Sequence, residues 1–141
     1  MKKSTLIFCM AISLFLAFAG TIARAQSRKP ATKEAGAKYG IASFYALKFE
    51  GRKTANGDIY HDSALTAACN ILPLNSWIKI TNLKNKRSVI VRINDRMHHK
   101  NKRLVDVSGR AARELQFFSK GLAKVKVEIL SNYKEPQQAT L

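Results

Sequence analysis

Three stretches in the second half of the chain alternate between hydrophobic and polar residues. The alternation runs through residues 77–83 (WIKITNL), 88–95 (SVIVRIND) and 123–130 (AKVKVEIL). A period of two predicts strands that bury one face. Asn82 and Asn85 predict a turn between the first two stretches, which therefore form a hairpin. The residues expected to face the core are Val89, Val91, Ile93, Val125, Val127 and Ile129.

A helical pattern follows Ser108. Serine is a favourable N-cap, and within residues 109–118 (GRAARELQFF) the side chains of Ala112, Leu115 and Phe118 form an apolar stripe at helical spacing. The pattern predicts one short helix.

Two earlier segments carry weaker patterns. Residues 39–47 (YGIASFYAL) are a strand candidate in which Phe44 and Tyr45 point to opposite faces. One of the two rings is expected to face the core and the other to be free to stack on a ligand, although core packing would explain both. Residues 64–74 (ALTAACNILPL) predict a short extended or helical piece that ends at Pro73. Several short strands with one helix predict a mainly β fold, a small barrel whose closure removes exposed edges.

The first residues predict a secretory signal. Two lysines precede an apolar run over residues 6–19, and residues 23–25 (ARA) have the form of a cleavage site. The run is shorter than the roughly 20 residues of a membrane-spanning helix. Cys9 lies inside it without the small preceding residue that lipid attachment requires. We therefore expect export after cleavage near Ala25, to the periplasm or beyond, with no lipid anchor and no stable membrane anchor.

The rest of the chain is long enough for one ordinary domain. Residues 26–37 are polar and lack apolar periodicity, so they predict a flexible leader. Residues 38–130 then form the domain, and residues 131–141 a flexible tail. We expect the protein to be a monomer.

The formal net charge is +16, and it stays strongly positive after the three basic residues of the expected signal are removed. Such a charge in a cytoplasmic protein would indicate nucleic-acid binding, but export excludes that partner. The polyanions outside the cytoplasm are cell-wall polymers, acidic glycans and anionic lipid headgroups. Because charge supplies attraction and not chemistry, solubility alone is an equally good account of it.

Cysteine and histidine usage excludes several kinds of site. Cys69 is the one cysteine outside the expected signal, so an intramolecular disulfide cannot form, and the thiol is either buried or reactive. A thiol enzyme would need a base near Cys69, and no histidine lies close in sequence. His98 and His99 are adjacent and should point opposite ways on an extended chain. We expect no metal site and no cofactor.

Three aspartates are candidates for chemistry. Asp95 ends the predicted strand at residues 88–95, and Asp106 lies two residues before the helix cap, where the helix dipole favours an anion. Asp58 follows an Asn-Gly pair that predicts a tight turn. Each has a simpler explanation, because an aspartate at a strand end commonly caps a turn or pairs with an arginine.

Residues 38–130 resemble the rare lipoprotein A (RlpA) family of septal-ring lytic transglycosylases. The resemblance rests on four motifs in the family's order and spacing: GIASFY from residue 40, TANGD from residue 54, INDR from residue 93 and VDVSGRAA from residue 105. It implies a six-stranded double-psi β-barrel with one or two short helices, the fold of expansins. It also implies cleavage of the MurNAc–GlcNAc bond in peptidoglycan glycan strands, with closure to 1,6-anhydromuramic ends.

The resemblance assigns roles to seven residues. Asp106 is expected to be the catalytic acid, and Asp95 to assist it by raising its pKa or by orienting it. The expected substrate contacts are Asp58, Tyr45, Thr54, Arg96 and Cys69, the last of which replaces a histidine common in the family. The alternative is an expansin-like module that binds or loosens the wall without cutting it.

Overall fold

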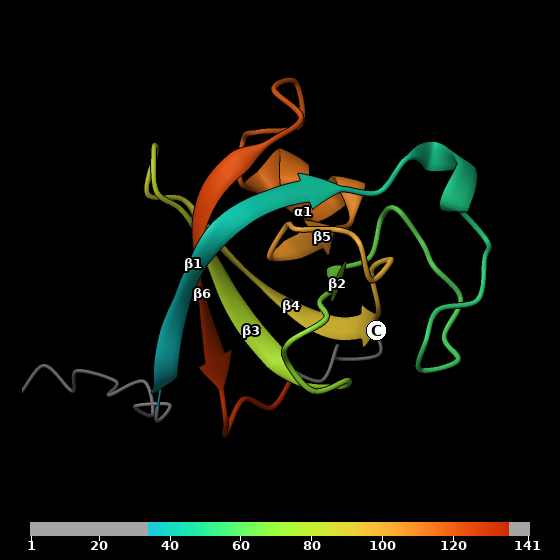
Figure 1. Cartoon of the computed structure of the whole chain (residues 1–141), viewed down its shortest axis with the longest axis horizontal. Helices are drawn as coiled ribbons and strands as arrows, with labels where there is room; N and C mark the ends of the chain where they lie inside the picture. The colour runs from blue at the N-terminus through green and yellow to red at the C-terminus, as the bar shows by residue number, and fades with distance from the viewer. Residues whose placement is uncertain (1–33, 136–141) are drawn as a thin grey trace, which may run out of the picture.

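The computed structural model describes residues 34–135 (Figure 1). Within this range six strands close into a barrel in the order β1-β5-β2-β4-β3-β6, so the mainly β barrel predicted from the sequence is confirmed. The predicted signal at residues 1–25 lies outside the described residues, as do residues 26–33 of the leader and 136–141 of the tail. The elements are β1 (Glu34–Phe44), the 3-10 helix η1 (Leu47–Phe49), β2 (Thr66–Ala68), β3 (Trp77–Asn82), β4 (Ser88–Asp95), β5 (Val105–Val107), α1 (Gly109–Glu114) and β6 (Ala123–Leu130).

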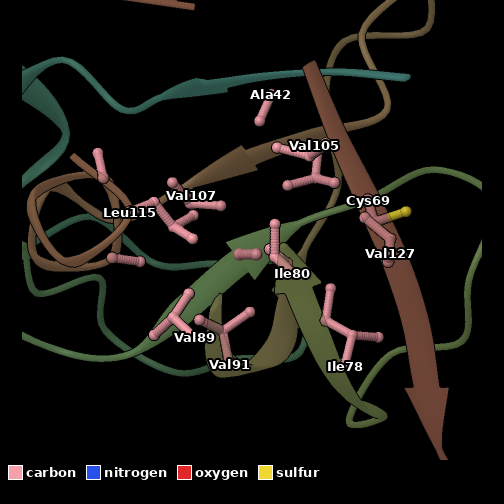
Figure 2. Packing of buried hydrophobic residues seen from close by; sticks show 14 of the residues in the cluster. Ala42, Cys69, Ile78, Ile80, Val89, Val91, Val105, Val107, Leu115 and Val127 are labelled. Carbon is pink, nitrogen blue, oxygen red and sulfur yellow. The ribbon is translucent and has the colours of Figure 1, made fainter. Parts of the chain in front are cut away.

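Strands β3 and β4 form the predicted antiparallel hairpin. Val89, Val91 and Ile93 are buried as expected, together with Ile78 and Ile80 from β3. These branched side chains meet in the middle of the barrel (Figure 2). Burying each one fully contributes about 1.5–3 kcal/mol relative to leaving it in water.

Strand β6 follows the predicted alternation only in part. Val125 and Val127 are buried, but Ile129 packs only at the margin of the core, and Glu128 is buried in its place. One residue of β6, Glu128, here opposes two of β1, residues 36 and 37, because Ala35 pairs with Ile129 while Lys38 pairs with Val127. A bulge interrupts the regular pairing on which alternate burial depends, and the alternating sequence of β6 does not predict it.

The helix begins where the sequence predicts, with the Ser108 hydroxyl accepting the backbone N–H of Ala111 at 3.3 Å. The predicted apolar stripe is wrong at its last residue. Phe118 is 37% exposed, and its neighbour Phe117, which was not part of the stripe, is buried in its place at 1% exposed. The helix ends before either ring, and Gln116 adopts a left-handed conformation with φ of 57°. The chain direction therefore changes between Leu115 and Phe117, so helical spacing no longer determines which ring turns inward.

The first strand begins at Glu34, four residues before the predicted start of the domain at Lys38, and ends at Phe44. Backbone pairing with β6 extends it through residues 34–37 (EAGA), which carry no apolar pattern. The piece predicted near residues 64–74 is extended and forms β2. No helix within residues 34–135 is long and apolar enough to cross a membrane.

Candidate active site

The two strand-end aspartates lie in one row across four neighbouring strands of the barrel. Ser43 of β1 pairs with Asp106 of β5, Asp106 pairs with Ala68 of β2, and Ala68 pairs with Asp95 of β4. Ala68 therefore separates the two aspartates, and its methyl group leaves the space between them open. Since adjacent strands are about 4.8 Å apart, the two aspartate Cα atoms are roughly 10 Å apart.

A bulge places Asp95 in this row. Ala67 pairs with Ile93, but the next residue, Ala68, pairs with Asp95, so Asn94 is passed over. With regular pairing Asn94 would oppose Ala68, and the side chain of Asp95 would point to the other face of the sheet. The bulge therefore brings a carboxylate to the position where regular pairing would place an amide.

The row borders a groove of about 610 Å³. Five of the predicted site residues line it, namely Tyr45, Thr54, Asp95, Arg96 and Asp106. Asp58 and Cys69 are not among the lining residues. The structure thus brings the two candidate acids together and leaves two of the expected substrate contacts outside the groove.

Three donors hold the carboxylate of Asp95. The Tyr45 hydroxyl donates to Oδ2 at 2.7 Å, and the backbone N–H groups of Ala55 and Arg96 donate to Oδ1 at 2.9 and 2.8 Å. Burial, and then the bond to Asp95, raise the pKa of Tyr45 well above its usual value, so the phenol stays protonated and keeps donating. These three hydrogen bonds hold the Asp95 carboxylate in a fixed orientation.

Asp106 has an asymmetric environment. Its Oδ1 accepts the Ser43 hydroxyl, which itself accepts a hydrogen bond from Arg103 Nη1 at 2.8 Å. Because Arg103 occupies a lone pair of Ser43, the single hydroxyl hydrogen is directed to Asp106. Its Oδ2 receives only a long contact of 3.4 Å from Asn101 Nδ2, and the Asp106 side chain is 20% exposed. One oxygen is therefore fixed, while the other is available to a ligand in the groove.

The rim of the groove is basic and aromatic. The Arg96 guanidinium donates to the carbonyl oxygens of Leu72, at 2.7 Å, and Cys69, which fixes it beside Asp95. The remaining basic lining residues are Lys48, Arg52, Lys53, His98 and Arg103. The Tyr45 ring stacks on Tyr60 with centroids 4.5 Å apart. Phe44 packs against the core but also lines the groove, as Tyr45 does, so the two rings are not divided between core and groove as predicted.

The turn at residues 54–58 supports the groove from one side. The backbone N–H of Thr54 donates to the Asp58 carbonyl at 2.8 Å, and Gly57 has a φ of +97° that glycine adopts without strain. The side chain of Asp58 accepts from Asn56 at 3.0 Å and pairs with Arg92, and these contacts, Asn56 first, lower its pKa. Asp58 therefore stabilises the turn that presents the Ala55 N–H to Asp95.

Cys69 is fully buried in the hydrophobic core (Figure 2). Of the two states expected for an unpaired cysteine, the buried one is confirmed. Its thiol has no access to the groove, and Cys69 contributes to the site through its backbone: its N–H donates to the Asp95 carbonyl at 3.1 Å, and its own carbonyl holds Arg96.

The expectation that His98 and His99 point opposite ways is wrong, since their ring centroids are 4.3 Å apart. The segment after Asp95 is not a strand, so the alternation of an extended chain does not apply. Across residues 34–135 there is no group of three His, Cys, Asp or Glu side chains that could hold a metal ion.

Sequence reasoning missed Ser43 and Arg103, which both act on Asp106. Ser43 could have been found, because it lies two residues before Tyr45 on the same face of a strand. Arg103 lies three residues before Asp106, with 3.8 Å between Nη1 and Oδ1, but many basic residues of this chain stand equally close to an acid in sequence.

The chain matches known proteins over the whole barrel. The family model described as "Lytic transglycolase" matches residues 37–127. A protein named "Endolytic peptidoglycan transglycosylase RlpA" from Haemophilus influenzae is 53% identical over 93 residues, which are 66% of this chain and 32% of that protein. The protein of the same name from Pasteurella multocida is 50% identical over 105 residues, 73% of this chain and 36% of that protein. This chain therefore spans about a third of the length of these two relatives.

Solved structures with lower identity share the fold. The Streptomyces papain inhibitor is 17% identical, with a TM-score of 0.56 over 70% of this chain and 97% of that chain. The apo form of the Clavibacter michiganensis expansin is 20% identical, with a TM-score of 0.57 over 72% of this chain and 54% of that chain. A mutant of that expansin in complex with cellohexaose is 16% identical, with a TM-score of 0.58 over 72% and 54% of the two chains. The double-psi β-barrel expected from the sequence is confirmed.

Proposed function

The chain belongs to the lytic transglycolase family, and we propose that it is an endolytic peptidoglycan transglycosylase. The observation that carries this proposal is the row in which Ala68 separates Asp106 from Asp95 along one groove. The names of the related proteins support peptidoglycan as the substrate. The glycan strands of peptidoglycan lie outside the cytoplasmic membrane. The export predicted from residues 1–25 would bring the protein to that location.

Asp106 is the residue best placed to transfer the proton. Its Oδ2 protonates the oxygen that links N-acetylmuramic acid to N-acetylglucosamine, the bond from that oxygen to muramic C1 breaks, and positive charge develops at C1. The ionised carboxylate then takes the proton of the muramic 6-hydroxyl as that oxygen bonds to C1. The product is a 1,6-anhydro end, no water is consumed, and Asp106 is protonated again.

Asp95 is suited to the complementary role. Its three donors fix the orientation of its carboxylate, which lies on the same groove as Asp106. A negative charge held there stabilises the positive charge that develops on the sugar. Hydrogen bonds hold both oxygens of Asp95, whereas Oδ2 of Asp106 receives only a long contact. This difference supports Asp106 as the acid and Asp95 as the stabilising anion.

Mass spectrometry of digested glycan strands tests the proposal. The purified chain should release fragments with 1,6-anhydromuramic ends, and Asp106→Asn should reduce their rate of formation about 10²–10⁴-fold, the typical contribution of a general acid. Asp95→Asn should also reduce the rate, because it removes the charge that stabilises the developing positive charge on the sugar. Full activity of Asp106→Asn would show that another group is the acid. Strand binding without any anhydro product would instead support an expansin-like module that does not cut.

A further inference from the structure

A second groove, of about 600 Å³, is lined by residues of the β3–β4 turn, the segment after α1 and the start of β6. Its walls combine three lysines, Lys84, Lys120 and Lys124, with the apolar side chains of Phe117 and Leu122. Leu122 is 51% exposed. The proposed chemistry of the first groove makes no use of these residues.

The three lysines converge without a counter-charge. They come from three separate segments, and no aspartate or glutamate is among the residues that line this groove. Within residues 34–135 none of the three forms an ion pair. Cations held around one concave surface repel one another, and a bound anion would relieve that repulsion.

The walls of the second groove are held firmly by backbone acceptors. The side-chain amides of Asn82 and Asn85 both donate to the Leu115 carbonyl at 3.0 Å, which fixes the β3–β4 turn against the end of the helix. The N–H of Gly121 donates to the Phe117 carbonyl at 3.0 Å, which fixes the loop before β6. A site with fixed walls loses little entropy when a ligand binds.

Aromatic contacts connect the two grooves. Phe44 lines the first groove and contacts Phe117 of the second, with ring centroids 6.1 Å apart. Phe118 stacks on Phe44 at 4.5 Å and is partly exposed beside this contact. Because Phe117 is buried, this contact joins the walls of the two grooves inside the protein.

We propose that the second groove binds carboxylate groups of the peptidoglycan on which the first groove acts. This inference rests on the proposed function, since that function names the polymer. Peptidoglycan presents carboxylates from two sources, the lactyl groups of muramic acid where no peptide is attached and the stem peptides where they are present. Lysine ammonium groups suit either source, and the apolar wall suits a sugar ring or a short side chain.

Binding by a double variant tests the second groove. Lys120→Gln/Lys124→Gln is compared with the control Lys38→Gln/Lys134→Gln, which removes the same charge from exposed lysines outside both grooves. Both pairs are made in an Asp106→Asn background so that strands are not consumed. The probes are glycan strands with stem peptides, strands stripped of them by an amidase, and neutral chitin oligosaccharides.

We expect the groove variant to bind strands about threefold to tenfold more weakly than its control, because each exposed charge pair contributes modestly. The difference should shrink at high salt and be absent for the neutral probe. Whichever strand preparation shows the larger difference identifies the source of the carboxylates. Equal weakening in both variants, or none in either, would overturn the inference. A parent chain that binds strands but releases no anhydro ends would overturn only the proposed lytic activity.

Discussion

Replacing Tyr45 with phenylalanine removes one hydroxyl and keeps the ring that stacks on Tyr60. That hydroxyl donates to Asp95 Oδ2 at 2.7 Å, and no other donor to this oxygen is present within residues 34–135. The two N–H groups on Oδ1 stay in place, so the carboxyl group itself is unchanged but its orientation is held through one oxygen only. Tyr45→Phe therefore tests whether the orientation of Asp95 matters apart from its charge.

The magnitude follows from the kind of hydrogen bond that is lost. Hydrogen bonds to charged groups contribute about 1.5–3 kcal/mol, and water in the open groove can replace part of this one. We expect the free energy of unfolding to fall by about 1–2 kcal/mol. If Asp95 must be oriented in the transition state, kcat/KM should fall about tenfold, which corresponds to about 1.4 kcal/mol. Denaturant titration and the rate of anhydro-end formation measure the two effects.

Tyr60→Phe is the matched comparison. It also removes a bond from a tyrosine to an aspartate, since the Tyr60 hydroxyl donates to Asp62 at 3.1 Å. Tyr60 borders the same groove as Tyr45, but the aspartate that loses its donor, Asp62, does not. The two variants should lose similar stability, and Tyr45→Phe should lose clearly more activity. Equal kcat/KM in Tyr45→Phe and the parent chain would refute the role given to the orientation of Asp95.

Three further predictions concern the framework around the groove. Gly109→Ala should lower the free energy of unfolding by about 1–3 kcal/mol, measured by denaturant titration, because its Cβ would lie 2.2 Å from Asp62 Oδ1 and displace that carboxylate. Phe117→Ala should cost about 3–5 kcal/mol, while Phe118→Ala, at a partly exposed ring, should cost much less; equal losses would contradict the burial described above. Burial opposes the ionisation of Asp62, but hydrogen bonds led by that from Arg113 outweigh it and lower its pKa. The stability that this shift contributes is present above the pKa of Asp62 in the unfolded chain, near 4, and is lost as the pH falls through its lower pKa in the folded chain. Acid titrations should therefore show a smaller loss of unfolding free energy for Asp62→Asn than for the parent chain.

The sequence was most informative where one physical signal acted alone. The alternation in β4 placed Val89, Val91 and Ile93 in the core, and the hydroxyl of Ser108 marked the start of the helix. These signals depend on neighbours in the chain, and a single sequence displays them directly.

The sequence was least informative where position depends on a partner strand. The burial of Glu128 and the alignment of Asp95 with Ala68 both occur beside bulges, and a bulge is a property of two strands. The choice between Phe117 and Phe118 depends on the left-handed Gln116. The resemblance to the RlpA family implied that Asp95 and Asp106 belong to one site, but the bulge that aligns them became visible only in the structure.

The pairing order of the barrel also has a consequence for how the chain folds. Strand β1 lies between β5 and β6, so the first strand finds its neighbours only after almost the whole domain is available. Pairings between such distant segments form slowly, typically in milliseconds to seconds, because the loop must close before the contacts stabilise it. The Ser43–Asp106 contact, which joins residues 63 positions apart, forms with that closure. An incompletely folded chain therefore has both aspartates but no groove to hold them, and any ability to cut the wall is acquired only when the barrel closes.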